Sequence, residues 1–163
     1  MTTTVCGVAV TLLLQASAIA SEKPDFSGAW ALDQDRSFSN PPGFNQTMTV
    51  TQNGNEIKLD AKVTTAQGEQ AISERFILDG QERDFTPPAG PQGAKGRRKA
   101  YWLPGDRGIV VEDQVTTDSP SGPVSQSTIR KWILSADGKT LTADYFIDSP
   151  RGSGQSKRIF VRK

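Results

Sequence analysis

The chain has 163 residues, with 19 Lys and Arg against 18 Asp and Glu, and it contains one Cys and no His. This near-neutral charge disfavours a dedicated nucleic-acid binder, which usually carries a clear basic excess. The absence of His removes the commonest general base and the commonest metal ligand. We therefore expect a single domain with a buried core, and neither a Ser-His-Asp triad, a metal site nor a cofactor.

The first twenty residues carry no charge and read MTTTVCGVAVTLLLQASAIA. The apolar run from Val5 to Leu14 has the length of a secretory signal, and it is shorter than the roughly 20 apolar residues that span a bilayer. Ala18 and Ala20 supply the small residues of a cleavage site. We predict a signal peptide over residues 1–20 and a single domain over residues 21–163; an N-terminal strand or helix of the domain is the alternative.

This leader predicts secretion, to the periplasm of a diderm bacterium, with no membrane span. The only cysteine, Cys6, lies inside it. The predicted mature chain therefore has no thiol nucleophile and no disulfide, although its compartment is oxidising.

Apolar and polar residues then alternate along most of the chain, as in strands with one buried face. In the first predicted strand, Phe26, Gly28, Trp30 and Leu32 share a face. Asn53-Gly54 predicts a hairpin turn between strands at 47–51 and 56–63, since both residues tolerate positive φ. The second of these strands alternates most regularly, with Ile57, Leu59, Ala61 and Val63 set between charged residues.

Residues 69–78 fit a strand or a helix, and the strand is favoured because Asp79-Gly80 is typical of a turn into a short strand at 81–85. Residues 86–96, TPPAGPQGAKG, predict a loop rich in Pro and Gly. The same alternation predicts further strands at 100–103, 109–115, 127–134, 140–147 and 158–162.

Nine or ten strands joined by short turns, without a convincing helix, indicate an all-β protein. Sequential hairpins form an antiparallel up-and-down meander, and closing it into a barrel of about 8–10 strands removes its exposed edges. A two-sheet β-sandwich is the alternative.

Two strings at the ends of the domain carry a family resemblance: DFSGAWALD at residues 25–33 and KRIFVR at residues 157–162. The chain resembles lipocalins and their calycin relatives, and more closely small secreted bacterial proteins described as lipocalin-like. That resemblance implies a barrel whose base is closed by Gly28 and Trp30 together with a basic residue of the last strand, Arg158 or Arg162. It also implies a small ligand held inside.

Three charged residues share a face with apolar neighbours: Glu74, Asp113 and Arg130. Because an unpaired buried charge is costly, such residues either pair, face a wet cavity, or indicate that the alternation shifts at a bulge. Two of them facing a lumen would orient a polar head group beside apolar walls. The predicted ligand-binding residues are Glu74, Trp102, Arg130, Trp132 and Tyr145, with core packing as the alternative for the two tryptophans.

A basic cluster follows the Pro- and Gly-rich loop, comprising Lys95, Arg97, Arg98 and Lys99. It lacks interleaved aromatic residues, so it does not predict nucleic-acid recognition. We interpret it as a solvated loop rim; contact with phosphate or an anionic surface is the alternative.

These features predict a secreted monomer or weak oligomer that binds a small apolar or amphipathic ligand non-covalently inside a β-barrel, with no nucleic acid as partner. A structural or protein-interaction module of the cell envelope is a second hypothesis, and it predicts a filled core and a concentrated exposed apolar patch. A third is an enzyme that uses carboxylates without His, which requires two acidic residues facing one pocket and a shifted pKa.

Overall fold

A computed structural model describes residues 23–88, 94–105 and 107–163; the predicted signal peptide lies outside them. These ranges contain ten strands and no helix. The strands are β1 (Gly28–Phe38), β2 (Asn45–Asn53), β3 (Glu56–Thr65), β4 (Gly68–Ile77), β5 (Glu82–Phe85), β6 (Lys95–Trp102), β7 (Gly108–Thr117), β8 (Val124–Leu134), β9 (Thr140–Ser149) and β10 (Gly152–Arg162).

All ten strands belong to one sheet, in the order β4-β3-β2-β1-β10-β9-β8-β7-β6-β5. Every pair of neighbours is antiparallel, and the pairing of β1 with β10 joins the two ends of the chain. The predicted antiparallel up-and-down meander is confirmed. The β-sandwich alternative is wrong because the β1–β10 ladder makes the two halves a single sheet.

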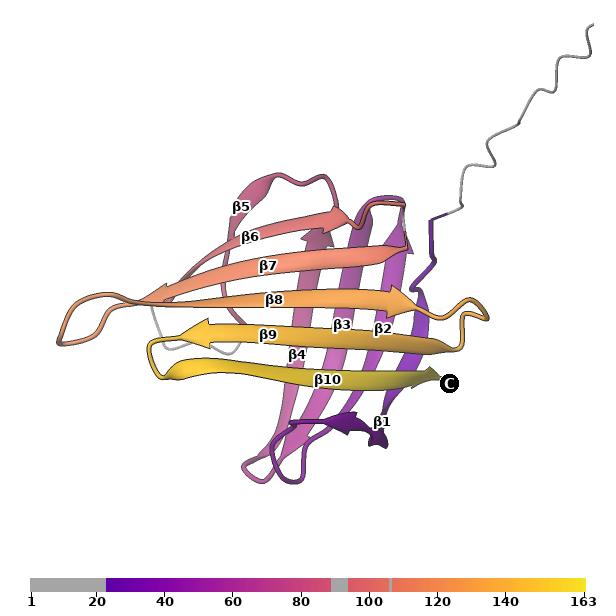
Figure 1. Ribbon diagram of the computed structural model, residues 1–163, viewed down its shortest axis with the longest axis horizontal. Helices are drawn as coiled ribbons and strands as arrows, with labels where there is room; N and C mark the ends of the chain where they lie inside the picture. The colour runs from indigo at the N-terminus through magenta and orange to yellow at the C-terminus, as the bar shows by residue number, and fades with distance from the viewer. Residues whose placement is uncertain (1–22, 89–93, 106) are drawn as a thin grey trace, which may run out of the picture.

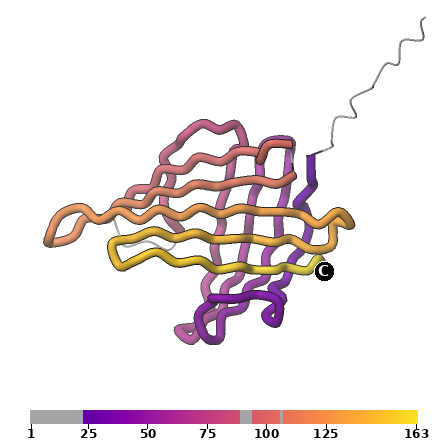
Figure 2. The backbone as a smooth tube through the Cα atoms, viewed as in Figure 1, coloured from indigo at the N-terminus to yellow at the C-terminus, as the bar shows by residue number. Residues whose placement is uncertain are grey.

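The sheet curls so that β2–β4 lie behind β6–β10 and run steeply across them, while β1 turns to the bottom of the view beside β10 (Figure 1). Figure 2 shows the same two halves along the backbone. The curled sheet has one seam, between β4 and β5–β6, where no backbone ladder forms. The result is a barrel that is open along that seam.

The ambiguous segment at 69–78 is a strand, as favoured. The predicted start of the next long strand at residue 100 is wrong, because β6 already begins at Lys95. Its side chains alternate between exposed Lys95, Arg97 and Lys99 and buried Gly96 and Arg98. Three of the four residues of the basic cluster therefore form a solvated rim, and Arg98 does not.

Large side chains fill the end of the barrel nearest the N-terminal segment. Trp30 and Trp132 are each 1% exposed and Phe26 is completely buried. The Phe26 ring packs against Trp102 and Trp132, and the Trp30 Nε1 donates a hydrogen bond to the Phe26 carbonyl at 2.9 Å. This filled end is hereafter the closed end.

Arg162 lies across the closed end, with its guanidinium 4.4 Å from the centre of the Trp30 ring. It donates hydrogen bonds to the carbonyls of Asp25, Ser27 and Gly138, which ties three segments together. Gly28 leaves room for it: its φ is +132°, and a Cβ there would lie 2.6 Å from the Arg162 Nη1.

None of the residues in the three described ranges belongs to an apolar helix of the length that a bilayer requires.

Candidate functional site: a charged barrel lumen

Four charged side chains meet inside the barrel: Glu74 of β4, Arg98 of β6, Asp113 of β7 and Arg130 of β8. Arg98 and Asp113 stand directly opposite each other in the β6–β7 ladder. Arg130 is diagonal to Asp113, because its own partner is Val111, two residues earlier on β7. Glu74 reaches this group across the open seam, and all four side chains are 8–10% exposed.

Each carboxylate of this cluster accepts hydrogen bonds from both guanidiniums. Arg98 donates through Nη2 to the Glu74 Oε1 and through Nε to the Asp113 Oδ1, both at 2.6 Å. Arg130 donates through Nη1 to the Glu74 Oε2 at 2.7 Å and through Nη2 to the Asp113 Oδ2 at 2.6 Å. Two positive and two negative charges thus compensate each other, as burial of ions requires.

The electrostatics of the cluster keep Glu74 and Arg130 ionised. Burial alone would raise the pKa of Glu74, but the attraction of Arg130 and Arg98 and their hydrogen bonds hold that pKa below its ordinary value. Burial would lower the pKa of Arg130, yet Glu74 and Asp113 raise it above its ordinary value. Both groups are therefore charged at neutral pH.

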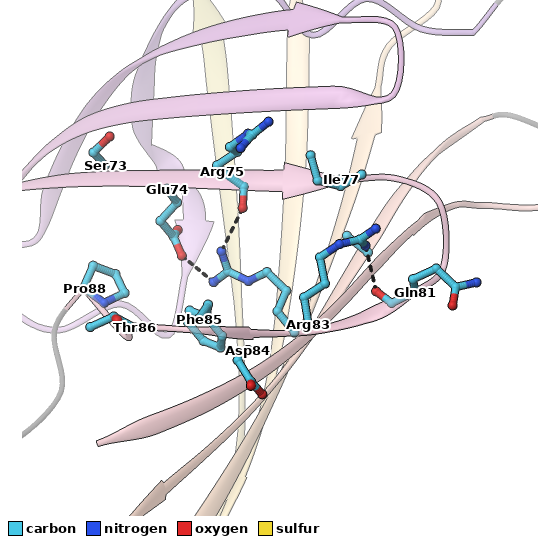
Figure 3. Close-up of a pocket in the computed structure, with 12 residues that line it drawn as sticks. Ser73, Glu74, Arg75, Ile77, Gln81, Arg83, Asp84, Phe85, Thr86 and Pro88 are labelled. Atoms are coloured by element: carbon cyan, nitrogen blue, oxygen red, sulfur yellow. Dashed lines mark hydrogen bonds and ion pairs between the residues drawn. The ribbon is translucent and has the colours of Figure 1, made fainter. Parts of the chain in front are cut away.

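Arg98 also bridges the seam that the backbone leaves open. Its Nη1 donates to the carbonyl of Arg75 on β4 at 3.3 Å, in addition to its ion pair with Glu74 (Figure 3). The Phe85 ring of β5 covers the guanidinium, with its centre 4.0 Å away. Gly96, directly opposite Phe85, gives the ring room, since a Cβ there would lie 2.4 Å from it.

A lumen cavity of about 250 Å³ adjoins the cluster. Leu59, Ala61 and Val63 of β3 and Ile72 of β4 form an apolar wall. The cluster, Tyr145 of β9 and Arg158 of β10 form the polar remainder, with Gln46 of β2 beside them.

Arg158 is held in the lumen by neutral groups. Its guanidinium lies 4.2 Å from the ring centres of both Phe44 and Tyr145. It donates hydrogen bonds to the side-chain oxygens of Asn40 at 3.1 Å and Gln46 at 3.2 Å. Within the described ranges, none of the ion pairs at 4.0 Å or less involves Arg158. The cavity is thus lined by three guanidiniums and two carboxylates.

The structure brings three of the five predicted ligand-binding residues, Glu74, Arg130 and Tyr145, to this one cavity. Trp132 instead packs against the rings of Phe26 and Phe76, each at 5.9 Å, within the closed end. Trp102 stacks on Phe26 at the same end, and its Nε1 donates to Asn55 at 3.0 Å. The expectation that both tryptophans border a ligand is therefore corrected, since both fill the closed end.

The four residues expected at the barrel base also separate. Gly28, Trp30 and Arg162 meet there, whereas Arg158 lies four residues earlier on the same face of β10 and lines the lumen instead. Sequence reasoning missed this position, and it missed Arg98 as the partner of Glu74 and Asp113. The signal for Arg98 was the alternation of Gly96, Arg98 and Ala100 with exposed basic residues.

Glu74 and Asp113 face one pocket, as a carboxylate enzyme would require. The lowered pKa of Glu74 makes it a poor general acid near neutral pH, and guanidiniums occupy the oxygens of both groups. The described residues contain no group of three or more His, Cys, Asp or Glu side chains placed to hold a metal ion.

Comparison with known proteins identifies the fold. No protein-family model matches the sequence, and a search of curated proteins gives no match. Zebrafish ileal bile acid-binding protein, solved in complex with cholic acid, is similar with a TM-score of 0.52 and 14% identity, over 85% of this chain and 98% of that one. Secretory abundant heat soluble protein 4 from Ramazzottius varieornatus is similar with a TM-score of 0.50 and 14% identity, over 87% of this chain and 96% of that one. At these identities the likeness shows a shared antiparallel β-barrel fold.

Proposed function

We propose that this protein binds, non-covalently in its lumen, a small amphipathic molecule that carries one acidic group, and that Arg158 binds that group. The observation that carries this proposal is the excess guanidinium, which faces an apolar wall across the cavity. Small-molecule pockets combine apolar walls with a few placed polar groups in this way. The solved complex of the similarly folded zebrafish protein with cholic acid supports the same class of ligand.

Arg158 is suited to this role because the other lumen arginines are already neutralised. Arg98 and Arg130 share the carboxylates of Glu74 and Asp113. Arg158 donates hydrogen bonds to amide oxygens through its Nε and its Nη1. Its Nη2 makes no hydrogen bond to the described residues. An acidic ligand would accept from that free nitrogen and balance the charge of the lumen.

The direct test compares octanoate binding by the wild-type chain and by Arg158→Met, using isothermal titration calorimetry. A lost charge-assisted hydrogen bond costs about 1.5–3 kcal/mol, so we expect binding to weaken by about 10- to 100-fold. Arg151→Met is the matched control, because Arg151 is exposed on the β9–β10 turn. Equal affinity of wild type and Arg158→Met would refute the proposed role of Arg158.

We also propose that the protein acts outside the cytoplasm, in the periplasm, on the basis of the uncharged apolar segment at residues 1–20. The expected result is that the chain recovered from the envelope of its host begins at Ser21, as measured by intact mass. A recovered chain that retains residues 1–20 would contradict this.

A protein-interaction role is the second candidate, and one observation favours it. Ile129 and Phe146 face each other in the β8–β9 ladder, and each is 42% exposed. They form a small apolar pair outside the barrel, which a partner protein would cover.

A further inference from the structure

A second cavity occupies the seam itself. It measures about 290 Å³ and lies between β4 and β5–β6 (Figure 3). Four residues line both this seam cavity and the lumen cavity: Glu74, Phe85, Pro88 and Arg98. These side chains are therefore the partition between two neighbouring spaces.

The members of the partition are held unequally. Glu74 and Arg98 are fixed by the buried ion pairs of the cluster. The Phe85 side chain makes no hydrogen bond. Its ring packs against the Arg98 guanidinium and fills the space that the missing side chain of Gly96 leaves. Phe85 is also the last residue of β5, a four-residue strand at the edge of the sheet. Phe85 and Pro88 are thus the members of the partition that packing alone retains, and of these two Phe85 is the larger side chain.

The sizes of the two cavities indicate why the partition between them matters for a ligand. Small-molecule pockets usually measure about 300–1,000 Å³. The two cavities, at about 250 Å³ and 290 Å³, lie at or just below the lower end of that range, whereas the two joined lie well within it. Beyond Phe85, the seam cavity offers apolar surface from Ile77 and Ala100 and the aliphatic stem of Arg83.

We propose that Phe85 determines the length of ligand that the barrel accepts. The acidic end binds Arg158 in the lumen, and a longer chain passes Phe85 into the seam cavity. The inference rests on the proposed function, because it assumes the acidic end at Arg158. It adds a specificity residue and assigns the seam to the tail of an elongated amphipathic acid.

The test measures dissociation constants of the full chain for octanoate, dodecanoate and tetradecanoate, in wild type, Phe85→Leu and Phe85→Ala. Opening the partition should increase the affinity for tetradecanoate relative to octanoate by about tenfold in Phe85→Ala, equivalent to burying roughly two more methylene groups. Phe85→Leu should show a smaller increase of the same sign. Phe38→Ala is the matched control, since Phe38 is 47% exposed at the far end of β1 and lines neither cavity.

Identical dependence on chain length in wild type and both Phe85 variants would overturn this inference, while Arg158-dependent octanoate binding would leave the proposed function standing. Failure of wild type to bind any of the three acids would overturn both. Thermal unfolding of each variant establishes that it is folded; if Phe85→Ala is not, the sign of the change in Phe85→Leu decides.

Discussion

Glu74 is the side chain on which the two halves of the barrel converge, since its carboxylate on β4 pairs with the arginines of both β6 and β8. Replacing it with Gln leaves two guanidiniums to share the single carboxylate of Asp113. Removing one partner of a buried ion pair costs about 3–5 kcal/mol, so we expect Glu74→Gln to lower the free energy of unfolding by about that amount, as measured by urea denaturation.

Glu56→Gln provides the matched control for this loss. Glu56 also accepts two hydrogen bonds from an arginine, Arg75, but this pair is exposed. We expect its urea midpoint to stay near that of the wild type, because solvent screens exposed ion pairs. An equal effect of the two substitutions would contradict the assigned importance of burial.

The difference in stability between wild type and Glu74→Gln depends on pH through the pKa of Glu74. Its pKa in the folded chain lies below the ordinary value of 4.5. The contribution of the ionised carboxylate is therefore complete above pH 4.5 and is lost as the pH falls through the folded-state pKa. The stability gap between wild type and Glu74→Gln should be constant near neutral pH and shrink below pH 4.5.

Among individual residues, the sequence identified the charges that needed an explanation but not how each is satisfied. Glu74, Asp113 and Arg130 stood out because they interrupt apolar faces. Their pairing was one of the alternatives, and it is the one found. The partner Arg98 was hidden among three exposed basic neighbours, and residues far apart in the chain meet only when the sheet curls.

At the scale of elements, β1 begins at Gly28, where the Arg162 guanidinium leaves no room for a side chain. We expect Gly28→Ala to destabilise the chain by about 1–3 kcal/mol, since the substitution combines a positive φ with a close contact to the guanidinium. Urea denaturation measures this change.

Gly154→Ala in β10 is the control, because a Cβ at Gly154 meets nothing within 4 Å. Its urea midpoint should stay close to the wild-type value. A Gly28→Ala variant as stable as Gly154→Ala would show that Arg162 does not constrain the start of β1.

Alternation predicted the existence of the strands better than their lengths. It located the hairpin at Asn53-Gly54, but it began β6 five residues late. Gly96 and Arg98 are atypical of a buried face. The Phe85 ring covers both, and the ion pairs with Glu74 and Asp113 compensate the charge of Arg98.

For the whole molecule, the meander was predictable because each hairpin is local in sequence. The open seam was not, since it depends on how far a curled sheet closes after ten strands. Charged side chains bridge this seam where a backbone ladder is missing. The same seam holds the seam cavity beside the lumen cavity.

The measurement that tests the account most directly is amide chemical-shift mapping of the full chain during titration with octanoate. We expect the largest shifts at lumen positions on both halves of the barrel, including Ile72, Tyr145 and Arg158. Shifts confined to the outer face around Ile129 and Phe146 would contradict lumen binding and favour the protein-interaction role instead.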